Sequence, residues 1–283
     1  MKTPKCFVRF VRFVREFCTE ITGRQREHVQ IVQSFELVGS VLPVSRRYQD
    51  LEWRVRPAKS PVMEQALIIG ASGGIGTAMS EALVSRGVAV TGLSRRDDGL
   101  DVTDEASVEA ALGGLDGPFD LIFVTTGALE LEGRGPEKSL KHLDAEAMRA
   151  QFMLNCVGPS LVMKHAVRLL PKEGRSVFAA LSARVGSIGD NGFGGWYSYR
   201  TAKAALNQMI HTGAIEIGRS HRQAICVALH PGTVETPLTE KYAKGHPTVT
   251  PQDAAVNLLS VIDGLTTEDT GQFYDWAGKR VPW

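Results

Sequence analysis

From Met63 onward, short apolar runs alternate with helical patterns, and this alternation restricts the possible folds more than any other feature of the sequence. The apolar runs cover residues 66–69, 88–93, 120–126, 176–181 and 224–229. Between them, apolar residues recur at helical spacing over 77–87, 104–112, 144–169 and 199–218. Strands that alternate with helices form a parallel sheet that is covered on both faces. With right-handed crossovers, the pattern predicts an α/β, doubly wound parallel sheet of Rossmann type.

In such folds ligands bind at the carboxyl ends of the strands, so the residues after each apolar run are candidates for a site. The first run is followed by GASGGIG, which places glycines at 70, 74 and 76. Glycines allow a tight turn and a close approach of the backbone to a pyrophosphate, and the next helix offers free N–H groups. A plain turn is the alternative, but the position between a strand and a helix favours a dinucleotide site. Its candidate residues are Gly70, Ser72, Gly74, Ile75 and Gly76.

The second run is followed by Ser94-Arg95-Arg96. An NAD site usually has a carboxylate here for the ribose 2′-hydroxyl, whereas a hydroxyl and guanidiniums suit a 2′-phosphate. We therefore expect NADP (NADPH), with NAD possible, although a solvated basic turn would look the same. Asp101-Val102 follows, where a short strand could end. The Asp101 carboxylate could accept a hydrogen bond from the adenine amine, or it could cap the next helix.

Two helical patterns contain polar residues that call for an explanation. Asn155 lies in the apolar stretch FMLNCVGPSLVM, where Pro159 removes the N–H that the Asn155 carbonyl would normally accept. This predicts either a seat for an ordered water or a simple proline kink. At the start of the last helical pattern, Tyr199 and Lys203 stand four residues apart, which puts a phenol and an ammonium on one helix face.

Together with Pro231-Gly232, these motifs resemble those of the short-chain dehydrogenase/reductase family, in the same order and over residues 65–283. The stretch YRTAKAALN and the ending GQFYDWAGKRVPW are most similar to the subgroup of C-factor-like and sniffer-like carbonyl reductases. The resemblance implies an enzyme that transfers hydride between NADPH and a carbonyl or alcohol substrate. It also implies the roles of the residues that match.

By this resemblance, Tyr199 is the proton donor and acceptor. The ammonium of Lys203 and a bound nicotinamide would lower the pKa of its phenol. Lys203 would also bind the nicotinamide ribose, and Asn155 would hold a water in the proton path. The nicotinamide carboxamide would lie against the turn after the last run, whose residues are Pro231, Gly232, Val234 and Thr236. Tyr197, which has no lysine partner, is interpreted as a packing or pocket residue.

The chain departs from the family pattern at two places. The serine that polarises the substrate carbonyl normally precedes the tyrosine by thirteen residues, but that count reaches Gly186. Alignment on the family's serine-to-glycine spacing reaches Ala183, with Ser182 one position early and Ser187 twelve before Tyr199. We favour Ser182 because it directly follows a strand.

The second departure lies after the 120–126 run. The family's Asn-Ala-Gly is replaced by Thr125-Thr126-Gly127. Threonine can still bind backbone or ribose groups, so we expect Thr126 and Gly127 to contact the cofactor.

An alternative function is a dinucleotide-binding signalling protein or redox sensor with little or no turnover, which the uncertain serine supports. A sugar epimerase or dehydratase is disfavoured because about fifty residues follow Pro231, too few for a larger substrate domain. Residues 237–251 occupy the place of the family's substrate loop, where Tyr242 and His246 are candidate substrate contacts. His142 and His211 are interpreted as structural.

Other expectations concern partners and location. The helical patterns at 144–169 and 199–218 are apolar on more than one face, which predicts a homodimer or homotetramer. The four cysteines have no metal-ligand spacing, so no metal is expected and a reducing cytoplasm is the simpler location. No apolar run reaches the length of a membrane span. We expect no integral membrane association and no nucleic-acid partner.

Residues 1–62 differ in composition from the rest, with twelve lysines and arginines against six acidic residues. The stretch FVRFVRFVREF could form a basic, aromatic helix for organelle targeting or membrane-surface anchoring. Yet every residue that the implied reaction needs follows Met63. We therefore expect residues 1–62 to be a basic extension, poorly ordered or outside the functional protein, and residues 63–283 to be the catalytic domain.

Overall fold

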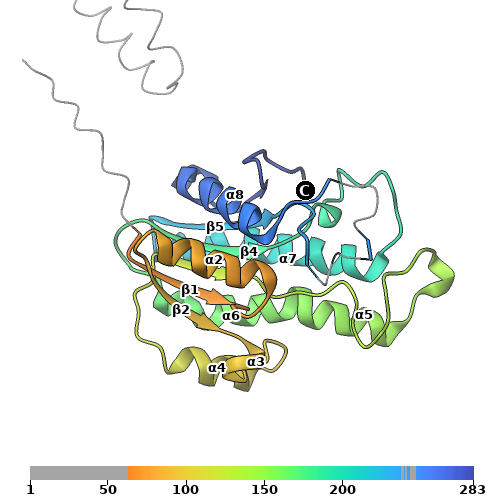
Figure 1. Ribbon diagram of the computed structural model, residues 1–283, viewed down its shortest axis with the longest axis horizontal. Coiled ribbons are helices and arrows are strands. Elements are labelled where there is room, and N and C mark those ends of the chain that lie inside the picture. Colours follow the sequence, from red (N-terminus) through yellow and green to blue (C-terminus); the bar gives the residue numbers. More distant parts are fainter. Residues whose placement is uncertain (1–62, 237–238, 240, 243–246) are drawn as a thin grey trace, which may run out of the picture. The chain divides into compact units, whose positions relative to one another are not determined.

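Figure 1 shows a computed structural model of the chain, which describes residues 63–236, 239, 241–242 and 247–283. The strands are β1 (Gln65–Ile69), β2 (Ala89–Leu93), β3 (Leu121–Val124), β4 (Ser176–Leu181), β5 (Ala224–His230) and β6 (Gln272–Asp275). The longer helices are α2 (Gly74–Ser85), α4 (Glu105–Gly113), α5 (Ala145–Phe152), α6 (Gly158–Ala166), α7 (Tyr197–Ile217) and α8 (Pro251–Gly264). A single short turn, α3 (Arg95–Asp98), follows β2. The predicted extension and its boundary near residue 62 lie outside the described residues.

The strands form one sheet in the order β2-β1-β3-β4-β5-β6, and every neighbouring pair is parallel. Each of the five apolar runs contributes a strand. The β3 and β4 strands are buried along their whole length, as expected where helices cover both faces. The predicted doubly wound parallel sheet is therefore confirmed.

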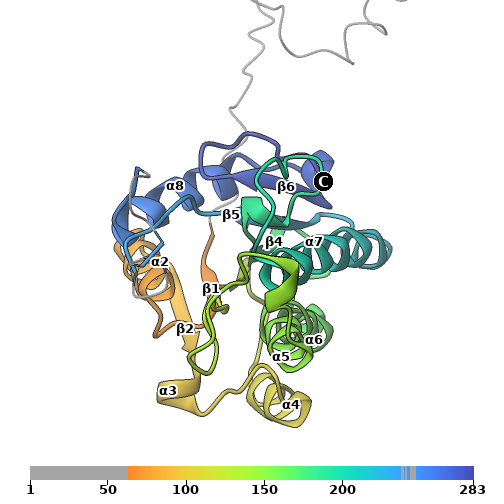
Figure 2. The same cartoon turned by 90° about the vertical axis from the view of Figure 1, so that its right-hand side faces the viewer.

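Successive strand residues point to opposite faces, which divides the core into two layers. Phe178 of β4 packs on one side, in a cluster with residues of α4, α6 and α7. Its neighbour Val177 packs on the other side, in a cluster with residues of α2 and α8. Figure 2 shows the same division, with α2 and α8 on one side of the sheet and the remaining long helices on the other.

The structure differs from the sequence prediction around Asp101 and at two elements near the C-terminus. Asp101 and Val102 are not in a strand, because the Asp101 carboxylate accepts hydrogen bonds from the backbone and hydroxyl of Thr103 and so forms a turn. The edge strand β6 was missed because Gln272 and Asp275 interrupt its apolar pattern. Helix α8 was not predicted either, although Thr250 caps it and Pro251 opens it.

The helical pattern predicted over 144–169 is divided in the structure. After α5, residues Met153–Val157 form a π-helical turn, which leads into α6 and then into a 3₁₀ turn at Val167–Leu169. Pro159 lies in the first turn of α6. Because proline lacks the N–H of an α-helical ladder, the wider turn before it is a local consequence of the sequence.

None of the helices in the described part of the chain is long and apolar enough to cross a membrane.

Candidate active site

The predicted site residues lie in loops at the carboxyl edge of the sheet and on the helices beside it. Gly70 follows β1, Ser94 follows β2 and Thr125 follows β3. Ser182 follows β4, and Pro231 follows β5. Since the strands are parallel, their carboxyl ends share one edge, where ligands bind in open α/β sheets.

The glycine loop is packed so closely that side chains would not fit. Gly70 has φ +90°, and a Cβ there would lie 2.7 Å from the Thr125 hydroxyl oxygen. A Cβ on Gly76 would overlap the Gly70 carbonyl, and one on Gly74 would lie 2.9 Å from a methyl carbon of Thr236. Helix α2 starts at Gly74 without a side-chain cap, so its first N–H groups remain available to an anion. Ser72 and Ile75 are half-buried in the same loop.

Thr126 provides a second sign of a ligand site. Its hydroxyl oxygen is buried and has no hydrogen-bond partner among the described residues. A Cβ on the next residue, Gly127, would lie 2.8 Å from Oδ1 of Asn155 and 3.4 Å from Nζ of Lys203. The unpaired hydroxyl therefore belongs to a loop that contacts two predicted catalytic residues. With the glycine cradle and the uncapped helix, it fits a bound dinucleotide.

The residues after β2 form a short capped turn. Ser94 is buried and caps α3 by accepting a hydrogen bond from the Asp97 N–H. Arg96 pairs with the Asp97 carboxylate, whereas Arg95 is exposed and forms no ion pair with any described residue. Of the two predicted guanidiniums, Arg95 is thus the one available to a phosphate.

Asp101 does not cap the following helix, since Asp104 does so by accepting from the Ala106 N–H. The hydrogen bonds from Thr103 keep the pKa of the Asp101 carboxyl below its usual value. Val102 is buried against α6, where a Cβ on Gly158 would lie 2.9 Å from a Val102 methyl carbon.

Asn155 is fully buried in the π-helical turn. Its Oδ1 accepts from the Ala128 N–H at 3.2 Å, and its Nδ2 donates to the Ala128 carbonyl at 2.9 Å. The same Nδ2 also donates to Oε1 of Gln151 at 2.7 Å, while Gln151 donates to the Leu129 carbonyl. The two amides therefore fix the loop after β3 to the helix α5–α6.

Tyr199 and Lys203 lie on the first turns of α7, with Lys203 Nζ 5.8 Å from the centre of the Tyr199 ring. Lys203 is buried and donates to the Leu181 carbonyl at the end of β4 at 2.9 Å. Burial lowers the pKa of Lys203 to about 8 and raises that of the Tyr199 phenol. The Lys203 ammonium alone does not produce the pKa lowering expected for Tyr199, because burial disfavours the charged forms of both groups.

The two candidate serines are both engaged elsewhere. The Ser182 hydroxyl is buried and donates to Oδ1 of Asn207 at 2.6 Å. The Ser187 hydroxyl donates to the Pro282 carbonyl at 2.5 Å and accepts from the Asp190 N–H. Ala183, the third aligned position, has no polar side chain. Both candidate hydroxyls therefore donate their protons to protein groups rather than to a substrate position.

The turn after β5 contains residues 231–236, which the resemblance assigns to the nicotinamide carboxamide. Gly232 has φ +83°, and a Cβ there would lie 3.1 Å from the indole of Trp276. Val234 is buried and forms an isolated parallel bridge with Val249, which ties the turn to the approach of α8. The Thr236 hydroxyl makes two long contacts, at 3.5 Å to the Val234 carbonyl and at 3.4 Å to the Thr239 hydroxyl.

Residues outside the core motifs have varied positions. In the predicted substrate loop, the Tyr242 hydroxyl donates to Glu130, and Lys241 pairs with the same carboxylate at 2.7 Å. His246 lies outside the described residues. His142 bonds to Ser139, and His211 bonds to the Gly271 carbonyl.

Sequence reasoning missed Glu137 and Trp196. Glu137 is buried, and its carboxylate accepts hydrogen bonds from the backbone and hydroxyl of Ser198 at the start of α7. Trp196, the residue before α7, contacts the Tyr199 ring edge-to-face, with 6.5 Å between the ring centres. Glu137 is sixty-one residues from its partner, and no periodicity or motif marks either residue.

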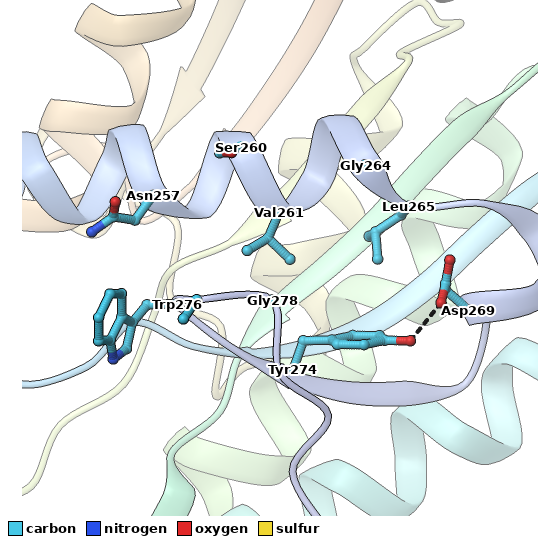
Figure 3. Close-up of a pocket in the computed structure, with 10 residues that line it drawn as sticks. Asn257, Ser260, Val261, Gly264, Leu265, Asp269, Tyr274, Trp276 and Gly278 are labelled. Carbon is cyan, nitrogen blue, oxygen red and sulfur yellow. Dashed lines mark hydrogen bonds between the residues drawn. The ribbon is translucent and has the colours of Figure 1, made fainter. Parts of the chain in front are cut away.

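A cavity of about 420 Å³ lies between α8 and β6, and Trp276, which packs against Gly232, is one of its lining residues. Figure 3 shows Tyr274 and Trp276 along its floor and Val261 and Leu265 reaching down from the α8 side. The Tyr274 hydroxyl donates to Asp269 at 2.5 Å. None of the predicted site residues lines this cavity. No cluster of potential metal ligands occurs within the described part of the chain.

Comparisons with known proteins agree with this geometry. A family model described as short chain dehydrogenase matches residues 64–247. The 1-hydroxy-2-glutathionyl-2-methyl-3-butene dehydrogenase of Rhodococcus sp. (strain AD45) is 35% identical over 240 residues, which cover 78% of this chain and 100% of the relative. The C-signal protein of Myxococcus xanthus is 32% identical over 167 residues, 59% of this chain and 94% of the relative.

Among solved structures, the NADPH-bound carbonyl reductase from chicken fatty liver has a TM-score of 0.65 at 22% identity. The alignment covers 78% of this chain and 94% of that one. At this identity the likeness concerns the fold. The family model and the relatives confirm the predicted resemblance to the family, and the C-signal protein is among those relatives.

The depressed pKa of Lys203 predicts a pH-dependent stability. Between about pH 8 and pH 10.5 the unfolded chain binds the lysine proton that the folded chain has released, so stability rises with pH. The free energy of unfolding of the cofactor-free protein, relative to Lys203→Met, should therefore increase by about 3 kcal/mol over this range and stay constant below pH 8. Denaturant titrations at several pH values would measure it, with the exposed Lys172→Met as control. A flat difference between wild type and Lys203→Met contradicts the prediction.

Proposed function

The chain belongs to the short-chain dehydrogenase family of NAD(P)-dependent oxidoreductases, and on this basis we propose that it reduces a small-molecule carbonyl with NADPH, or oxidises the corresponding alcohol. The observation that carries the proposal is the position of Tyr199 and Lys203. They share one face of α7, and Lys203 Nζ approaches Gly127 in the loop with the unpaired Thr126 hydroxyl. This position would put an acid–base pair next to the dinucleotide site that we propose.

The residues that would hold the dinucleotide follow from the loops at the sheet edge. Free N–H groups at the start of α2 would bind the pyrophosphate, and Ser94 and Arg95 would face the 2′-phosphate. Thr126 and Lys203 would bind the nicotinamide ribose, and the turn that starts at Pro231 would position the carboxamide. When bound, the reduced nicotinamide supplies the hydride.

Tyr199 would give its proton to the carbonyl oxygen of the substrate. Its raised pKa keeps the phenol protonated and so suits a donor in the reductive direction. Lys203, with a pKa of about 8, would stabilise the phenolate that remains and would exchange a proton near neutral pH. The Asn155 and Gln151 amides would hold the loop after β3 against this pair, where a water could complete the proton path.

A second candidate function is a dinucleotide-binding sensor with little turnover. The observation in its favour is that the hydroxyls of Ser182 and Ser187 both donate hydrogen bonds to other residues.

The cytoplasmic location of the protein stays a prediction.

The Tyr199→Phe variant tests the proposed reaction. It removes the proton donor but keeps the ring, so turnover should fall by roughly two to four orders of magnitude while NADPH affinity stays near wild type. NADPH oxidation with aldehydes, ketones and quinones would give the rates, and fluorescence of bound NADPH would give the affinity. Tyr197→Phe is the matched control. If wild type binds NADPH but turns over none of these substrates, the sensor is favoured instead.

The cofactor choice depends on Arg95. Arg95→Ala should raise the Michaelis constant for NADPH by about tenfold or more, since a charge-assisted bond to phosphate is lost, and should leave that for NADH nearly unchanged. Arg96→Ala, whose guanidinium already pairs with Asp97, is the control. Equal effects of Arg95→Ala on both cofactors would remove the case for NADP.

We further propose a homodimer or homotetramer that pairs through α5 and α7. Apolar side chains exposed on this side support it: Met148, Phe152, Met153, Met209 and Ile215. Light scattering at micromolar concentration should give a multiple of the chain mass, and Phe152→Glu combined with Met209→Glu should reduce it. A wild-type monomer at that concentration would refute the pairing.

A further inference from the structure

The backbone just before α7 has an unusual conformation. Three successive residues, Gly194, Gly195 and Trp196, have φ of +64°, +67° and +52°. Glycine adopts this left-handed region freely, but a tryptophan there costs roughly 1–2 kcal/mol. Strain of this kind persists only where the surroundings enforce it, and it is concentrated at functional sites.

The surroundings of Trp196 enforce it from two sides. Its N–H donates to the Glu137 carbonyl at 2.6 Å, and the buried Glu137 carboxylate holds Ser198 two residues further on. On the other side, the Arg200 guanidinium donates to the carbonyls of Gly195 at 2.9 Å and Gly194 at 3.1 Å. An ordinary turn would not need an arginine and a buried glutamate.

The result of this conformation is the position of the indole. Trp196 lies edge-to-face against Tyr199 and also against Tyr242, whose ring centre is 5.5 Å away. Glu130 anchors Tyr242 by accepting from its hydroxyl and from Lys241. Three aromatic rings therefore follow one another and end at the phenol that we assign as proton donor.

These rings are not simply part of the hydrophobic core. Each of the three residues is half-buried rather than fully enclosed. For Tyr199, the packed surroundings desolvate the phenol while part of the residue stays accessible. Trp196 also occupies the N-cap of α7, a position where serine, threonine, aspartate or asparagine would stabilise the helix, and its side chain makes no capping bond. The Glu137 carboxylate caps the first turn of α7 instead, by accepting from the Ser198 N–H. The Trp196 side chain therefore has no capping role, and the strained backbone presents its indole beside Tyr199.

We propose that Trp196 is a specificity-determining residue, whose indole forms with Tyr242 an aromatic wall that selects carbonyl substrates carrying a planar aryl group. The inference rests on the proposed function, because it takes Tyr199 as the group that meets the carbonyl. Contacts between aromatic rings are stronger than burial of the same area alone would give. A flat ring attached to the carbonyl gains this contact, whereas a saturated ring of the same size does not.

The test compares acetophenone with cyclohexyl methyl ketone, which share a carbon skeleton but differ in planarity. The kcat/KM ratio of the aryl to the cyclohexyl ketone should fall about five- to tenfold in Trp196→Leu and return to within about twofold of wild type in Trp196→Phe. Phe193→Leu is the matched control, since Phe193 is in the same loop and 98% exposed. A ratio unchanged in Trp196→Leu, even with both rates lowered, overturns the proposal, because the indole would then be merely structural.

Binding of the two ketones to the NADP⁺ complex, measured by saturation-transfer NMR, separates this proposal from the proposed function. The oxidised cofactor cannot reduce a ketone, so the measurement is independent of turnover. Wild type should bind acetophenone in preference to the cyclohexyl ketone, and Trp196→Leu should lose this preference. That result supports the aromatic wall even if wild type reduces neither ketone, in which case only the proposed reaction fails. Equal binding of both ketones by wild type, or binding of neither, overturns the wall whatever the turnover.

Discussion

The burial of both faces of the parallel sheet is the constraint on which the rest of the structure depends. A strand covered on both sides must be apolar along its length, so polar and flexible residues are confined to the loops. Because the strands are parallel, the loops at their carboxyl ends share one edge. Helix α7 packs beside β5 and carries Lys203 to the end of β4, where its ammonium reaches the Leu181 carbonyl at 2.9 Å. The site is therefore positioned by the same packing that stabilises the sheet.

Most of the fold followed from local patterns in the sequence. Five of the six strands are continuous apolar runs, and the glycines of the first loop have the tight packing that their spacing predicted. Strand β6 was missed because an edge strand need not be apolar throughout. Glu137 and Trp196 were missed for a different reason. Their roles depend on contacts with Ser198 and Tyr199 that exist only after folding, and a single sequence contains no signal for them.

The candidate serines show a further limit of motif reasoning. The spacing narrowed the choice to positions 182, 183 and 187, but it could not reveal what each hydroxyl contacts. Asn207 engages Ser182, and the Pro282 carbonyl engages Ser187, so partners far along the chain decide the availability of both. The predicted lowering of the Tyr199 pKa failed for a similar reason. The charge of a neighbouring lysine can be read from the sequence, whereas the burial that outweighs it cannot.

The π-helical turn has a consequence for how the length of this segment can change. Such a turn accommodates one residue more than an α-helix of the same length, so Met153–Val157 contains a built-in insertion. Removing one residue would restore a regular helix and rotate α5 by about 100° against α6. The Asn155 amide would then lose its hydrogen bond to the Ala128 carbonyl, and the Gln151 amide would lose its hydrogen bond to the Leu129 carbonyl. Single-residue deletions and insertions should therefore be far less tolerated here than in the surface loops of the same domain.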